Sequence, residues 1–144
     1  MKIRVCWVKT GGARSAAIED LAAQYVKRIA AFAQIETQEF KSEAALLKSL
    51  EKSSAKLVVL DLRGREYSSE QFAEWLRLQR DASVQLMFAI GGADGFSDDA
   101  RRAATTQISL GEMTLPHELA RVVLLEQIYR AFTILAGHPY HLGH

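Results

Sequence analysis

Short apolar runs alternate along the chain with longer segments whose apolar residues recur every three or four positions. The short runs predict β-strands, and the three-to-four spacing predicts helices with a buried face. Strands are expected at residues 2–8, 34–40, 57–62, 84–90 and 106–110. Helices are expected at residues 16–32, 43–53, about 69–80, 97–104 and 116–136. The expected N-caps of the second, third and fourth helices are Ser42, Ser68 or Ser69, and Ser97, and Pro116 is expected in the first turn of the last helix. This alternation predicts an α/β fold with a mainly parallel sheet and helices on both faces.

The final predicted helix is apolar around most of its circumference. Its apolar residues are Leu119, Val122, Val123, Leu124, Leu125, Ile128, Tyr129, Phe132 and Leu135. A helix of this kind is buried on nearly every side. In a domain this small, a second buried face predicts a subunit interface. The alternative is a helix that is enclosed within its own chain.

The chain has 144 residues, which suits one domain spanning residues 1–144. The chain has 18 Lys and Arg residues and 17 Asp and Glu residues. This balance disfavours a protein that binds nucleic acid by charge alone, but it is compatible with a local basic patch. The single cysteine, Cys6, lies in an apolar run and is expected in the core of a cytoplasmic protein. With no apolar stretch long enough to span a membrane and no zinc-ligand spacing, we expect neither a membrane nor a metal partner.

Three predicted strands are each followed by a loop that contains glycine, at residues 60–64, 90–95 and 109–116. Ligands of open parallel sheets bind beyond the carboxyl ends of the strands, and glycine lets the backbone approach them closely. Three such loops at one edge favour a ligand site over ordinary turns. The glycine-rich fingerprints of dinucleotide and triphosphate sites are missing, and residues 91–95 and 111–116 hold no lysine or arginine. An uncharged or cationic adenosine-type ligand fits better, and S-adenosylmethionine is one option.

The C-terminal segment HPYHLGH, residues 138–144, is the second candidate region. Imidazole side chains exchange protons near neutral pH, and tyrosine can stack on a nucleobase or donate a hydrogen bond to it. The alternative is a frayed chain end without a function.

The run IGGADGFS, the later run SLGEMTLPHELARVVLLEQIYRAFTI and the C-terminal HPYH, in this order, resemble the RlmH family. This family is the small, single-domain branch of the SPOUT methyltransferases, and the likeness covers the whole chain. It implies that the C-terminal part of the α/β fold is threaded through a loop into a trefoil knot. It also implies methyl transfer from S-adenosylmethionine to N3 of a pseudouridine in 23S ribosomal RNA, by a cytoplasmic homodimer acting on the assembled ribosome.

The resemblance also implies roles for individual residues. The cofactor pocket would be formed by Leu60, Gly91, Gly92, Gly111, Glu112, Met113, Thr114, Leu115 and Pro116. Catalysis would involve the C-terminal pair, His141 as the group that handles the N3 proton or orients the base and Tyr140 as a wall of the site. RNA contacts would come from Lys9, Arg14, Arg130 and His138, the last of which could instead cap the final helix. The tail would lie beside the partner subunit's pocket.

One position departs from the family's pattern. An arginine usually follows the Tyr-His pair, and here Leu142 stands in its place, so RNA binding would need Arg130 or His144 instead. Two other functions stay open. One is a SPOUT methyltransferase that acts on another RNA such as tRNA, and the other is a non-enzymatic, flavodoxin-like regulatory module that binds no cofactor.

Overall fold

The computed structural model describes residues 1–92 and 94–142, so Ala93, Gly143 and His144 lie outside it. Its elements follow one another as β1 (Lys2–Val8), α1 (Ala16–Ile29), β2 (Gln34–Phe40), α2 (Glu43–Glu51), β3 (Lys56–Glu66), α3 (Ser69–Asp81), β4 (Leu86–Ile90), α4 (Asp98–Ala103), β5 (Thr106–Ser109), α5 (His117–Ala136) and the short 3-10 helix η1 (Pro139–His141). All of the predicted strands and helices are confirmed, with ends that differ by a few residues. The helix η1 had no predicted counterpart.

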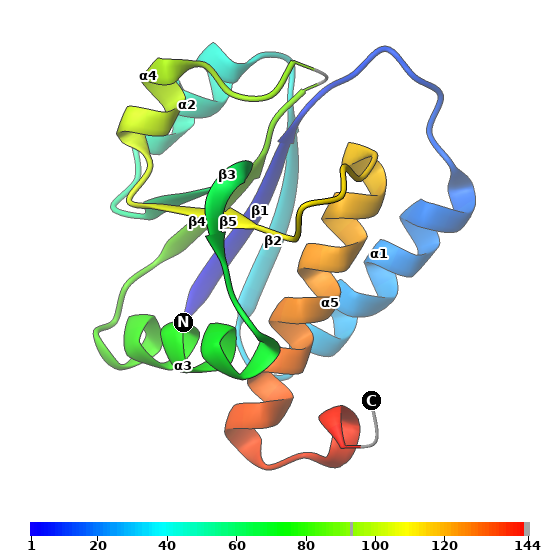
Figure 1. Cartoon of the computed structure of the whole chain (residues 1–144), viewed down its shortest axis with the longest axis vertical. Helices are drawn as coiled ribbons and strands as arrows, with labels where there is room; N and C mark the ends of the chain where they lie inside the picture. The colour runs from blue at the N-terminus through cyan, green and yellow to red at the C-terminus, as the bar shows by residue number, and fades with distance from the viewer. Residues whose placement is uncertain (93, 143–144) are drawn as a thin grey trace.

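The strands form one sheet in the order β2-β1-β4-β3-β5, and all neighbouring pairs are parallel. Helices α1, α3 and α5 lie on one side of the sheet, and α2 and α4 lie on the other (Figure 1). Every residue of β4 is buried, as its continuous apolar run predicts for a strand covered on both faces. Cys6 is fully buried in the core beneath α2, and this burial raises the pKa of its thiol to about 11.

Serine side chains begin several of the helices. The Ser42 hydroxyl accepts a hydrogen bond from the Ala45 N–H at 3.1 Å, as predicted for an N-cap. Of the two candidates for α3 the structure selects Ser68, which forms a complete capping box with Gln71. The expectation for Pro116 was wrong by one residue, because proline is the N-cap of α5 and the first turn begins at His117.

Strand β3 continues four residues beyond its predicted end at residue 62, because it bends around β5. Leu60 and Arg65 both pair with Ile108 of β5, one before the bend and one after it. At the bend, a Cβ on Gly64 would lie 2.6 Å from the carbonyl carbon of Gln107, so only glycine fits. Figure 1 shows the end of β3 passing across β5. This crossing brings the loop after β3 close to β5, while the trefoil knot itself stays a prediction.

Helix α5 packs between α1 and α3 on the sheet. Leu124, Leu125 and Ile128 are fully buried within the chain. Contacts within one chain therefore cover much of the apolar surface of α5. The outer side of its first turns is different, since Leu119 is 43% exposed and Val123 is half-buried. Neither α5 nor any other helix within the described ranges is both long and apolar enough to cross a membrane.

Candidate functional site

Residues 60–63, predicted as a loop but part of β3 in the structure, meet the loops after β4 and β5 at a cavity of about 870 Å³ at the carboxyl edge of the sheet. Its lining includes Leu60, Gly91, Gly92, Gly111, Met113, Thr114, Leu115 and Pro116. The structure therefore brings together all the residues predicted to hold the cofactor except Glu112, which is exposed and lies outside the lining. The volume lies within the range of small-molecule sites, about 300–1,000 Å³.

Close backbone packing shapes the loops around this cavity. A Cβ on Gly91 would lie 3.0 Å from the carbonyl carbon of Gly95, so the loop after β4 folds back on itself tightly. After β5, the Ser109 hydroxyl accepts a hydrogen bond from the Gly111 N–H at 3.2 Å and donates one to the Gly111 carbonyl at 3.0 Å. Gly111 has a φ of +140°, which favours glycine. These contacts leave backbone and apolar side chains at the cavity wall.

One wall of the cavity carries an ion pair that the sequence did not predict. Arg101 of α4 donates to Asp61 at 2.8 Å, and the Arg63 N–H donates to the same carboxylate at 2.9 Å. Burial of Asp61 opposes ionisation, but these hydrogen bonds outweigh it and lower the pKa of the carboxyl. The two loops that follow β4 and β5 lack cations, yet Arg63 and Arg101 reach the cavity from outside them. Asp61 pairs with both arginines, which reduces the positive charge that this wall presents to a ligand.

The loop after β1 lies beside the cavity. His117 lines the cavity, and its Nε2 is 2.7 Å from the Thr10 hydroxyl of that loop. Two predicted RNA contacts come from this loop: Lys9 is exposed, and Arg14 forms an ion pair with Glu39 of β2. Lys9 and Arg14 line a separate, smaller pocket that includes His117, the residue after the predicted cofactor residue Pro116.

A buried arginine holds this end of the molecule together. The guanidinium of Arg121, whose side chain is 5% exposed, lies 4.1 Å from the centre of the Trp7 ring and donates to Glu19 at 2.7 Å. It therefore ties α5 to β1 and α1 at the base of the loop that carries Lys9 and Arg14. Arg121 was not among the predicted site residues, although a charge among the apolar residues of the last helix was the available signal.

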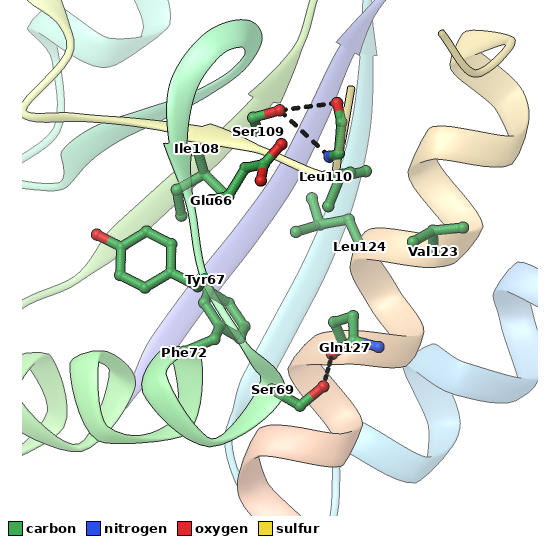
Figure 2. Close-up of a pocket in the computed structure, with 11 residues that line it drawn as sticks. Glu66, Tyr67, Ser69, Phe72, Ile108, Ser109, Leu110, Val123, Leu124 and Gln127 are labelled. Atoms are coloured by element: carbon green, nitrogen blue, oxygen red, sulfur yellow. Dashed lines mark hydrogen bonds between the residues drawn. The ribbon is translucent and has the colours of Figure 1, made fainter. Parts of the chain in front are cut away.

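A second, smaller cavity of about 250 Å³ lies on the α3 and α5 side of the sheet (Figure 2). It shares Ile108, Leu110 and Gly111 with the larger cavity, so the end of β5 separates the two. Figure 2 shows Ser69 donating to the Gln127 side chain, at 2.8 Å. Its walls are mainly apolar, and no sequence feature predicted it.

The predicted catalytic pair lies in η1, against the last turns of α5. The Tyr140 hydroxyl donates to Glu126 at 3.0 Å, and the Tyr140 ring packs on that of Tyr129 with centres 4.7 Å apart. Burial, together with side-chain hydrogen bonds to Tyr25 and Glu126, raises the pKa of Tyr140 well above its ordinary value. A raised pKa keeps the phenol protonated near neutral pH, while its role as a wall of the site stays a prediction.

The other residues predicted for the tail bind one another. Arg130 donates to Glu126 at 2.9 Å and lies 3.0 Å from Nδ1 of His141. His138 directly follows Gly137, the C-cap of α5, and its role at the end of that helix stays a prediction. Its Nδ1 accepts a hydrogen bond from the Tyr140 N–H at 3.1 Å and so begins η1.

The structure does not bring the two predicted groups of site residues together within one chain. The cavity lies at the start of α5, whereas Tyr140 and His141 lie beyond its end. Helix α5 has 20 residues, and at 1.5 Å per residue this corresponds to about 30 Å. Within the part of the chain that the structure describes, no group of three or more His, Cys, Asp or Glu side chains is arranged to hold a metal ion.

Comparisons with known proteins show which proteins the chain resembles. A family model described as "Predicted SPOUT methyltransferase" matches residues 1–141. A protein of Koribacter versatilis named "Ribosomal RNA large subunit methyltransferase H" is 48% identical over 148 residues, covering 100% of both chains. A protein of the same name from Geobacter sulfurreducens is 40% identical over 154 residues, covering 98% of this chain and 99% of its own.

Solved structures share the fold at low sequence identity. A probable methylase family protein from Haemophilus influenzae superimposes with a TM-score of 0.62 at 11% identity, over 96% of this chain and 70% of its own. The SpoU methyltransferase AviRb from Streptomyces viridochromogenes, in complex with AdoMet, superimposes with a TM-score of 0.55 at 13% identity. That match covers 90% of this chain and 57% of AviRb.

Proposed function

Since the chain belongs to the SPOUT methyltransferase family, whose cofactor is S-adenosylmethionine, we propose that it methylates N3 of a pseudouridine in 23S ribosomal RNA. The relatives named for large-subunit ribosomal RNA match it from end to end, which favours this substrate over tRNA. The same match disfavours the regulatory module. We place the reaction in the cytoplasm, on the assembled ribosome.

The convergence of residues 60–63 of β3 with the loops after β4 and β5 on one cavity carries this proposal. Leu60, Ile90 and Leu110 supply apolar surface for an adenine ring, and the glycine loops supply main-chain groups. Arg63 and Arg101 line the cavity together with Asp61 and Asp94, so the charges of its wall balance and do not exclude a ligand with a positively charged sulfonium. The residues present therefore fit S-adenosylmethionine, which supplies an electrophilic methyl group.

The active site is completed by a second copy of the chain. The tail covers the outer side of α5 at Glu126 and Arg130, while Leu119 stays exposed and Val123 half-buried one to three turns earlier. Two α5 helices packed antiparallel would bury the bare apolar surface and set each tail beside the other chain's cavity. This contact is self-complementary, as a two-fold dimer requires. It unites Tyr140 and His141 of one chain with the cofactor residues of the other.

In this arrangement the protein works mainly by positioning. The N3–methyl bond forms as the bond from methyl to sulfur breaks, with its electron pair returning to sulfur, and the N3 proton passes to water. Lys9 and Arg14, beside the cavity, hold the RNA backbone. Tyr140 closes the site as a protonated, packed ring.

Calorimetry with S-adenosylmethionine tests the cavity. The wild-type protein should bind it, and Gly91→Val should not, since the added Cβ displaces the loop at Gly95. Gly11→Val is the matched control, because no atom lies within 4 Å of a Cβ at that position. Absence of binding at millimolar S-adenosylmethionine would instead favour the non-enzymatic regulatory module.

Methyl transfer to ribosomes from a strain lacking the enzyme tests the substrate. We expect the label in 23S RNA at N3 of a pseudouridine. Label in tRNA from the same extract, with none in the ribosomes, would establish the alternative substrate.

A further inference from the structure

The hydrogen bonds around His141 determine which of its ring nitrogens carries a proton. Nδ1 lies 3.0 Å from Nη1 of Arg130. A guanidinium can only donate hydrogen bonds, so Nδ1 must be the acceptor. In the neutral ring, the proton is therefore on Nε2.

The second ring nitrogen points to helix α3. Nε2 lies 2.7 Å from Oε1 of Glu70 and donates to that carboxylate. This hydrogen bond lowers the pKa of Glu70, and exposure of 65% of its side chain also favours the ionised form. Glu70 lies in the first turn of α3, 71 residues before His141 in the sequence, and nothing in the sequence pattern indicated this contact.

The arginine is itself held in place from α5. Its Nε donates to Glu126 at 2.9 Å, and its guanidinium carbon lies 4.9 Å from the centre of the Tyr140 ring. Glu126 also accepts hydrogen bonds from the Tyr140 hydroxyl and the Gln127 amide. Arg130 therefore cannot turn away from His141 without breaking several contacts.

We propose that His141 serves in methyl transfer as a neutral hydrogen-bond donor through Nε2–H, and not as the base. Arg130 is the positioning residue that fixes this tautomer. Glu70 is the positioning residue that holds the N–H in place until a carbonyl oxygen of the substrate replaces the carboxylate. The inference rests on the proposed function for the identity of that substrate.

The chemistry of the nucleobase suits a donor at this place. N3 lies between two carbonyl groups, so the charge left when its proton passes to water spreads onto both oxygens. A fixed N–H donor to one of them stabilises that charge in the transition state. A base would need an unprotonated nitrogen facing the substrate, and the only such nitrogen of neutral His141 is taken by Arg130.

Nitrogen NMR of the free protein tests the tautomer without any methyl transfer. With ¹⁵N-labelled histidine, long-range proton–nitrogen spectra distinguish the two tautomers of each ring, and loss of signals in His141→Gln assigns His141. We expect the Nε2–H form in the wild-type protein and a mixture of tautomers in Arg130→Met. The Nδ1–H form in the wild-type protein would overturn the proposal, whatever the substrate proves to be.

Kinetics on ribosomes separate a donor from a base. Glutamine keeps an N–H donor but cannot act as a base, so His141→Gln should keep kcat within about tenfold of the wild type. His141→Ala should lose about 10- to 100-fold in kcat with the affinity for S-adenosylmethionine unchanged. Equal loss in both variants, each folded by circular dichroism, would show that His141 is the base.

Variants of Glu70 test its positioning role. Glu70→Ala should lower kcat several-fold, and Glu70→Gln, which keeps an acceptor oxygen, should restore most of the loss. Glu74→Gln is the matched control, since Glu74 is exposed one turn further along α3 and pairs with Arg77. Identical activity of Glu70→Ala and the control would remove Glu70 from the site. A wild-type protein that methylates no ribosomal RNA would refute the proposed function and leave the tautomer standing.

Discussion

Replacing Gly64 with alanine tests the crossing of β3 over β5. The added Cβ would lie 2.6 Å from the carbonyl carbon of Gln107 and 2.7 Å from the backbone nitrogen and carbonyl carbon of Ile108. Carbon atoms in good contact are about 3.5–4.0 Å apart, so the two strands would have to separate by roughly 1 Å. Both sides of the bend are paired to Ile108, which leaves the backbone little freedom to move.

The expected loss of unfolding free energy depends on which atoms have to move. Overpacking a core where side chains can shift costs about 1–3 kcal/mol. At Gly64 the atoms that must move are backbone, so we expect Gly64→Ala to lose about 3 kcal/mol or more of unfolding free energy. The cofactor affinity should fall as well, because β5 leads directly into the loop at residues 110–116 that lines the cavity.

Guanidinium denaturation followed by tryptophan fluorescence measures this loss. Gly12→Ala is the control, since nothing lies within 4 Å of a Cβ there, and we expect its unfolding free energy to change by less than about 0.5 kcal/mol. If the two variants unfold at the same denaturant concentration, the strands do not cross at this distance and the reasoning is wrong.

Three further predictions concern the interface, the cavity wall and the buried arginine. Leu119→Glu should give monomers that bind S-adenosylmethionine but transfer no methyl group. The control Leu78→Glu, which alters a 52% exposed leucine on α3, should change neither the oligomeric state nor the activity. Sedimentation measures the oligomeric state of both variants, and a methyl-transfer assay measures their activity. Because the pKa of Asp61 is lowered by folding, its contribution to stability is complete above its ordinary pKa of about 4 and is lost as the pH falls through the lower folded value. Asp61→Asn should therefore flatten the decline of the denaturation midpoint in that acid range. Arg121→Met should lower the unfolding free energy by about 1–2 kcal/mol in thermal denaturation, less than for a fully buried pair because Glu19 is partly exposed.

Local patterns predicted the elements well because their causes are local. The continuous apolar run at residues 57–62 marks a strand covered on both faces, and serine before an apolar segment marks a helix start. The glycine loops also identified the cavity, since strand ends of a parallel sheet share one edge. For the same reason nearly all of the predicted cofactor residues line it.

The missed features depend on contacts between distant parts of the chain. The extension of β3 to Glu66 is caused by pairing with β5, about 40 residues later, and the sequence of residues 63–66 carries no strand pattern. Arg101 reaches the cavity because Asp61 binds it across 40 positions. The hydrogen bond between His141 and Glu70 likewise cannot be predicted from the sequence pattern, because the two residues are 71 positions apart.

Mixing two defective chains tests most directly whether the active site is shared between subunits. Gly91→Val should disable the cavity of its own chain, and His141→Ala should disable the tail of its own chain. In mixed dimers, one cavity and one tail remain intact together, so unfolding and refolding an equal mixture should restore about a quarter of the wild-type sites. Recovery of methyl transfer towards that level is the predicted result. An activity no higher than the mean of the two separate variants, with mixed dimers shown to form, would mean that each chain builds its site alone.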